Sequence, residues 1–88
     1  MGIGENEKAN YTTSIYPNPC NGWFTAEIPV NSKFIITITN AQGLTIKTIN
    51  SDTKTLKVET AGLSSGLYFV TLTNTTSGLK EIHKLIVR

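Results

Sequence analysis

The stretch Gly66-Leu67-Tyr68-Phe69-Val70-Thr71-Leu72-Thr73 decides the fold. In an extended chain, Tyr68, Val70 and Leu72 fall on one face, and Leu67 and Phe69 fall on the other. Because β-branched and aromatic residues pack well on a pleated surface, this alternation favours a strand over a helix. The sequence therefore predicts its strongest strand from Leu67 to Thr73.

Shorter alternating stretches lie on both sides of this strand, separated by proline, glycine and asparagine. Phe34, Ile36 and Ile38 share one face of such a stretch, and a turn follows it with a positive φ expected at Gly43. A second turn is expected at 63–66. The predicted strands are Thr12–Tyr16, Gly22–Ile28, Lys33–Asn40, a segment from Leu44 to Ile49 with a bulge near Lys47 and Thr48, Thr55–Glu59, Leu67–Thr73 and Leu79–Arg88.

Composition agrees with an all-β protein. The 88 residues suit one small domain and include 14 threonines and 10 isoleucines but only 4 alanines, a poor mixture for helices. No segment of helical length repeats its apolar residues with the helical period. Seven short strands with turn signals at regular spacing are typical of a β-sandwich, so we predict an all-β, seven-stranded sandwich with Greek-key character.

Charge and cysteine content exclude several functions. A net charge of +2 is too small for a nucleic-acid binder that works by neutralising phosphates. One cysteine and one histidine exclude an internal disulfide framework and a Cys- or His-rich metal centre, so no cofactor is expected. We find neither an apolar run near the ~20 residues of a membrane helix nor a secretory signal peptide. Cys20 with His83 as its base lacks flanking support, so we expect no enzymatic activity.

The two ends of the chain differ in character. Residues 1–13 are polar and are expected to form a flexible linker ahead of a domain at 14–88. Lys80, Lys84 and Arg88, against Glu81, carry the whole net charge. The last strand, Lys84-Leu85-Ile86-Val87-Arg88, is apolar and basic, so it is either paired in a sheet or offered to a partner. Such a strand also favours strand-swapped homodimers at high concentration.

Three blocks of sequence together resemble a known family. They are Ile15-Tyr16-Pro17-Asn18-Pro19 with Gly22-Trp23-Phe24, then Leu63-Ser64-Ser65-Gly66-Leu67-Tyr68-Phe69-Val70, and finally Lys84-Leu85-Ile86-Val87. In this order and spacing, residues 14–88 resemble the type A C-terminal sorting domain of the type IX (Por) secretion system of Bacteroidetes. The resemblance implies a seven-stranded Ig-like sandwich, in agreement with the strand pattern.

The resemblance also implies a function without catalysis. Such a domain is covalently linked to an N-terminal cargo protein and directs it from the periplasm through the type IX translocon to the cell surface or the medium. An outer-membrane shuttle protein recognises the domain. A sortase-like cysteine peptidase usually removes it by a cut ahead of the Tyr16-Pro17-Asn18-Pro19 block, and the cargo is often joined to an anionic lipopolysaccharide.

The resemblance assigns roles to particular residues. The terminal strand is the recognition element, which maps to Lys84, Leu85, Ile86, Val87 and Arg88. The remaining motif residues are expected to be structural, in turns and sheets: Tyr16, Pro17, Asn18, Pro19, Gly22, Gly66 and Tyr68. Trp23, Phe24 and Phe69 are expected to be core or half-buried residues.

Two other functions stay open. The first is a carbohydrate-binding or adhesion module, because sandwich folds host many functions. Most of the aromatic residues, however, fall where the core is expected. The second is a spacer of the fibronectin type III kind.

Overall fold

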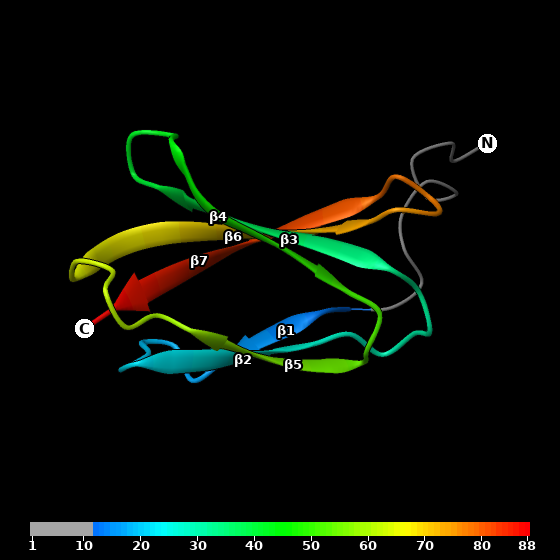
Figure 1. The fold of residues 1–88 in the computed structure, drawn as a ribbon, viewed down its shortest axis with the longest axis horizontal. Coiled ribbons are helices and arrows are strands. Elements are labelled where there is room, and N and C mark those ends of the chain that lie inside the picture. Colours follow the sequence, from blue (N-terminus) through cyan, green and yellow to red (C-terminus); the bar gives the residue numbers. More distant parts are fainter. Residues whose placement is uncertain (1–11) are drawn as a thin grey trace.

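The computed structural model describes residues 12–88, which form strands and turns (Figure 1). Residues 1–11, most of the predicted linker, lie outside the described range. Within residues 12–88, no helix is long and apolar enough to cross a membrane. The strands are β1 (Ser14–Tyr16), β2 (Trp23–Glu27), β3 (Phe34–Asn40), β4 (Thr45–Ser51), β5 (Thr55–Glu59), β6 (Gly66–Asn74) and β7 (Lys80–Val87).

The strands form two antiparallel sheets that pack face to face (Figure 1). One sheet has the order β1-β2-β5, and the other has the order β4-β3-β6-β7. Since β2 pairs with β5 and β3 pairs with β6, strands distant in the sequence are neighbours in space. This is the Greek-key connectivity of an Ig-like sandwich, so the predicted fold class is confirmed.

The core lies between the two sheets and follows the alternation read from the sequence. Phe24 and Ala26 point inward from β2, and Tyr68, Val70 and Leu72 point inward from β6. Inward residues of paired strands lie on one face of their sheet. The two inward faces meet because the sheets pack against each other (Figure 1). The buried apolar residues are Cys20, Phe24, Ala26, Ile28, Phe34, Ile36, Ile38, Val58, Tyr68, Val70, Leu72, Leu85 and Val87.

The predicted bulge exists, but it lies earlier in the strand than expected. Ile38 pairs with Lys47 and Thr39 pairs with Thr45, so Ile46 is the extra residue of β4. The shift leaves Ile46 exposed on the edge strand and lets Ile49 pack against the core. The sequence pattern predicted a bulge near Lys47 and Thr48, and the extra residue, Ile46, lies directly before Lys47.

The turns also agree in part with the prediction. Gly43 adopts a φ of +89°, and the preceding Asn40 side chain accepts the N–H groups of Gln42 and Leu44 at 2.9 and 3.0 Å. The turn before β6 lies earlier than the predicted 63–66, since the Leu63 N–H donates to the Thr60 carbonyl at 3.0 Å. Gly66 is therefore the first residue of a strand.

Candidate functional site

The terminal strand β7 alternates its side chains between the core and the surface. Leu85 is fully buried and Val87 is 3% exposed, so both help to close the core. Lys84, Ile86 and Arg88 are exposed. The five predicted recognition residues thus divide into two that hold the strand in the sandwich and three whose side chains a partner can reach without unfolding the domain.

β7 lies at an edge of the four-stranded sheet, where a strand leaves one row of backbone groups unpaired. The Asn18 carboxamide covers part of this edge. Its Nδ2 donates to the Lys84 carbonyl at 2.6 Å, and its Oδ1 accepts the Ile86 N–H at 3.0 Å. Asn18 therefore bonds to β7 as the peptide group of a neighbouring strand would.

Cys20 continues the same edge with its own backbone. The Cys20 N–H donates to the Ile86 carbonyl at 2.8 Å, and the Arg88 N–H donates to the Cys20 carbonyl at 3.0 Å. These bonds form a parallel bridge between Cys20 and Val87. Pro17 and Pro19, both after cis peptide bonds, lie on either side of Asn18. Residues 17–19, for which the sequence predicts a turn, therefore cover the end of β7 together with Cys20.

The two motif glycines hold the chain at the ends of neighbouring strands. Gly22 adopts a φ of +95°, which favours glycine, and its carbonyl accepts the Thr60 N–H at 2.9 Å. Gly66 begins β6 opposite Val87. Gly22 therefore lies beside the end of β5, and Gly66 lies beside the end of β7.

Tyr68 joins the middle sequence block to the terminal strand. It is buried, and it lies opposite Leu85 in the register of β6 and β7. Its hydroxyl donates to the Ser64 carbonyl at 2.7 Å, the arrangement called a tyrosine corner in Ig-like sandwiches. All three sequence blocks thus meet around the last residues of β7.

Tyr16 is the motif residue that points elsewhere. It lies opposite Thr25 on the outer face of the three-stranded sheet, which it shares with Trp23. Trp23 is 39% exposed, more than the core or half-buried position predicted for it. The Lys57 ammonium lies 5.1 Å from the centroid of the Trp23 ring. Lys57 therefore occupies a face of the indole on which a sugar would stack, and this does not favour the carbohydrate-binding alternative.

A hydrogen-bonded group that the sequence did not predict joins the start of the domain to β7. The Thr13 N–H and hydroxyl both donate to Glu81 Oε1, the former at 2.8 Å. His83 Nε2 lies 2.8 Å from the same hydroxyl oxygen. The side chains of Thr13, Glu81 and His83 therefore form one hydrogen-bonded group. Thr13, at the end of the predicted linker, is only 2% exposed.

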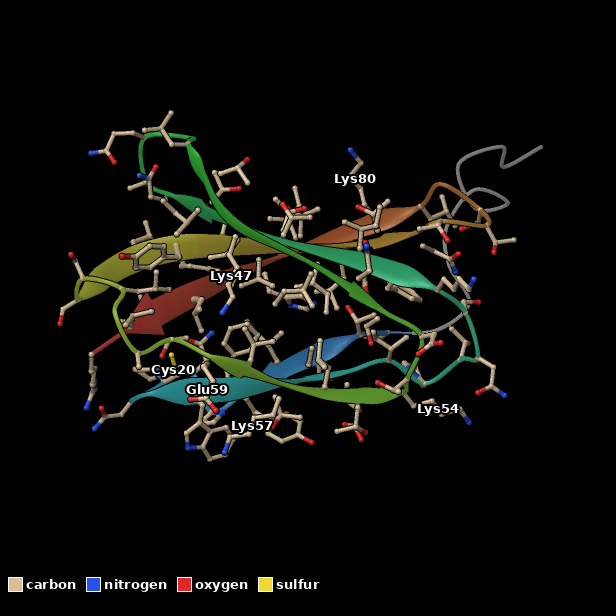
Figure 2. The ribbon with its side chains drawn as sticks, viewed as in Figure 1. Cys20, Lys47, Lys54, Lys57, Glu59 and Lys80 are labelled. Carbon is tan, nitrogen blue, oxygen red and sulfur yellow. The ribbon has the colours of Figure 1, made fainter. Side chains whose placement is uncertain are left out.

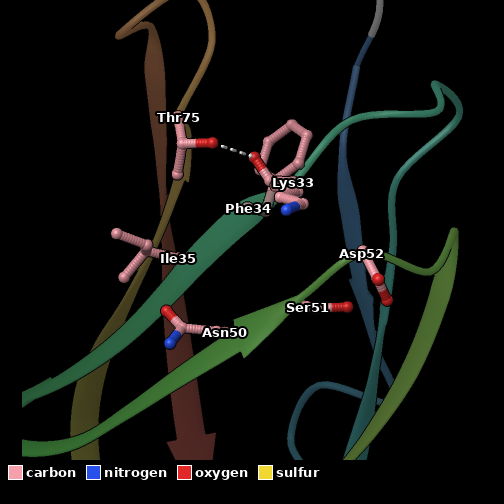
Figure 3. Close-up of a pocket in the computed structure, with 7 residues that line it drawn as sticks. All are labelled: Lys33, Phe34, Ile35, Asn50, Ser51, Asp52 and Thr75. Carbon is pink, nitrogen blue, oxygen red and sulfur yellow. Dashed lines mark hydrogen bonds between the residues drawn. The ribbon is translucent and has the colours of Figure 1, made fainter.

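Cys20 and His83, the candidate nucleophile and base, contact different residues. His83 bonds to Thr13, whereas the buried Cys20 thiol lies near Thr60 Oγ1 at 3.9 Å. The described residues contain no group of three or more His, Cys, Asp or Glu that could hold a metal ion. An open pocket lies between β3, β4 and the turn after β6, lined by Lys33, Phe34, Ile35, Asn50, Ser51, Asp52 and Thr75 (Figure 3).

That pocket has no nucleophile paired with a base. Thr75 Oγ1 donates to the Lys33 carbonyl at 3.0 Å, as the dashed line in Figure 3 shows. The Ser51 hydroxyl lies 3.2 Å from Thr53 Oγ1. These hydroxyl groups therefore form hydrogen bonds between or within the segments that line the pocket.

Comparison with known proteins supports the resemblance. The family model described as a secretion system C-terminal sorting domain matches residues 14–88. Among solved structures, the chain is similar to PorZ of Porphyromonas gingivalis, described as an essential bacterial surface component of the type-IX secretion system. The TM-score is 0.73 at 21% sequence identity, and the match covers 86% of this chain and 11% of that one. No curated protein matches the chain.

Proposed function

The chain belongs to the family of secretion system C-terminal sorting domains, and we propose that it directs a covalently attached N-terminal cargo protein across the outer membrane. In the finer steps, the cargo passes through the periplasm and an outer-membrane shuttle protein recognises β7. A sortase-like cysteine peptidase then removes the domain, and the cargo is attached to the cell surface or released. The domain itself has no catalytic part.

One observation carries the proposed role of the terminal strand. All three family blocks meet on β7, where Asn18 and Cys20 bond to its edge and Tyr68 lies opposite Leu85. The strand is therefore held in a defined position while Lys84 and Ile86 remain exposed. A strand that is fixed but accessible suits recognition by a partner.

Reporter secretion tests this function. A fluorescent reporter with an N-terminal signal peptide is fused ahead of residues 1–88 and expressed in a Bacteroidetes host with a working type IX system. We expect the reporter on the surface or in the medium, and in the periplasm when the host lacks the translocon. A fusion to a fibronectin type III domain controls for a spacer. Reporter retained in the periplasm by the intact system would refute the proposal.

The structure also guides how recognition is tested. Deleting residues 84–88 removes Leu85 and Val87 from the core, so it confuses loss of the signal with loss of the fold. Substitutions at the exposed Lys84 and Ile86 leave the core intact, and they are the sharper test.

The contacts of Thr13 bear on where the peptidase cuts. The Thr13 N–H is bonded to Glu81, and the side chain is buried. A peptidase needs an extended, accessible strand, so we propose that the cut falls ahead of Thr13. The mass of the domain released by the host measures this. A fragment that begins after Thr13 would show that the domain opens before it is cut.

A further inference from the structure

The outward row of β7 and the adjoining row of β6 form one surface, the β6–β7 outer face. Its composition follows from the strand register, because residues directly opposite each other point to the same side of a sheet. The cross-strand pairs of this face are Ile86 with Leu67, Lys84 with Phe69, Ile82 with Thr71, and Lys80 with Thr73.

This face exposes apolar side chains that the sandwich does not use. Ile82 is 63% exposed and Ile86 is 36% exposed, while the half-buried Phe69 and Leu67 lie on the neighbouring strand. The inward row of β7, with Leu85 and Val87, already supplies the packing that holds the strand. A row of exposed isoleucines on an edge strand favours aggregation unless a partner covers it.

The charged side chains of this face are all basic. Lys80 and Lys84 lie on it, and Arg88 follows in the same alternation; Figure 2 shows Lys80 projecting away from the three-stranded sheet. Of the side-chain carboxylates in residues 12–88, Glu27 and Glu59 lie on the three-stranded sheet. Asp52 follows β4, and Glu81 points inward to Thr13. The face therefore complements an anionic partner.

The order of residues along β7 separates two kinds of anionic partner. Lys84 lies between Ile82 and Ile86 on the same row, with about 6.6 Å between successive members. A bilayer that accepted both isoleucines would leave the ammonium between them to bend back toward the headgroups, with no fixed partner opposite it. A protein surface can instead place a carboxylate opposite Lys84 and apolar residues on either side.

We propose that the partner that reads the terminal strand docks on the β6–β7 outer face with an acidic protein surface. This surface presents two apolar contacts about 13 Å apart, for Ile82 and Ile86, and a carboxylate between them for Lys84. The inference rests on the proposed function. Leu85 and Val87 stay in the core of the bound domain, so recognition does not require β7 to leave the sheet.

The secretion assay tests this surface with matched variants in the 1–88 fusion. We expect Lys84→Glu and Ile82→Ser each to lower the secreted fraction at least about fivefold, the factor for about 1 kcal/mol of lost binding. Lys84→Arg retains the charge and is expected to secrete within about twofold of the native domain. The controls are Leu44→Ser, since Leu44 is 64% exposed at a distant turn, and Lys54→Glu in another loop.

The outcomes separate this inference from the proposed function. If the native domain secretes the reporter and Lys84→Glu and Ile82→Ser do so equally well, the docking face is wrong while the sorting function stands. If Lys84→Arg fails as Lys84→Glu does, charge is not what the partner reads. Melting temperatures of the purified variants within about 2 °C of the native domain exclude unfolding as the cause.

Vesicle flotation tests the lipid alternative. The purified chain is mixed with vesicles of 70% phosphatidylcholine and 30% phosphatidylglycerol. We expect the chain to stay in the unbound fraction. Flotation that Lys84→Glu abolishes would overturn the protein partner and assign this face to a membrane surface.

Discussion

Asn18 is the residue whose removal tests most directly how the sequence motifs hold the terminal strand. Asn18→Ala deletes both the Nδ2 bond to the Lys84 carbonyl and the Oδ1 bond to the Ile86 N–H. No core residue changes, and the backbone of residues 17–20 keeps its bonds through Cys20. The substitution therefore isolates the side-chain cover of the β7 edge.

The size of the effect follows from the exposure of the bonded groups. A hydrogen bond between neutral groups contributes about 0.5–1.5 kcal/mol net to stability. Asn18 is exposed, so water replaces part of each lost bond and the low end applies. We expect the free energy of unfolding to fall by about 1 kcal/mol for the pair. In a domain of this size that lowers Tm by roughly 4–8 °C.

Thermal unfolding and amide hydrogen exchange together measure the prediction. Asn40→Ala is the control, because the Asn40 carboxamide also makes two hydrogen bonds to the backbone, in its case by accepting the N–H groups of Gln42 and Leu44 in another turn. Both variants are expected to lose similar stability. Only Asn18→Ala should lower the protection of the Ile86 amide, by more than about tenfold, since that N–H then faces water without any opening of the fold.

Two results would contradict this reasoning. An unchanged Tm with unchanged Ile86 exchange would mean that the carboxamide does not hold the edge in solution. Equal loss of Ile86 protection in both variants would mean that its exchange reports global unfolding only. Asn18→Asp adds a check, because it keeps the acceptor for Ile86 but turns an oxygen toward the Lys84 carbonyl, so it should be no more stable than Asn18→Ala.

Three further predictions concern the fold around this strand. Leu85→Ala should lower the free energy of unfolding by about 2–5 kcal/mol because Leu85 is fully buried. Ile86→Ala, one position later and exposed, should lower it by less than about 1 kcal/mol. Urea unfolding measures both, and similar losses would contradict the inward and outward alternation of β7. Tyr68→Phe removes the bond to the Ser64 carbonyl and should cost about 1 kcal/mol in the same assay, and an unchanged midpoint would show that the tyrosine corner adds no stability. Cys20, which is fully buried, should react with a water-soluble disulfide reagent only as fast as the domain opens, so rapid labelling under native conditions would place the thiol at the surface.

Alternation of apolar residues predicted most of the fold. Phe34, Ile36 and Ile38 point inward because a strand that covers a core has a period of two, which the sequence displays directly. Local sequence does not set the exact position of the bulge, because the extra residue, Ile46, is defined only by the pairing of β4 with β3. Trp23 is more exposed than the predicted core or half-buried position, because it alternates with the buried Phe24 and so lies on the outer face of its sheet.

The contacts of the candidate site were harder to predict than its location. The resemblance pointed to residues 84–88 and to the Tyr-Pro-Asn-Pro block as separate features. That Asn18 bonds to Lys84 and Ile86 could not be read locally, because these residues are far apart in the sequence and meet only through the topology of the two sheets. The same holds for Thr13 with Glu81 and His83, for which no spacing rule exists.

The parallel course of β1 and β7 has a mechanical consequence. Thr13 meets β7 near its beginning and Cys20 meets it near its end, so the chain enters at one pole of the sandwich and β7 finishes at the other (Figure 1). Tension between an attached protein ahead of Thr13 and a partner gripping β7 acts along the strands. The hydrogen bonds of Asn18 and Cys20 to β7 then bear the load together, in shear, and do not break one after another. Loading in shear therefore favours a domain that stays folded while a partner pulls on β7.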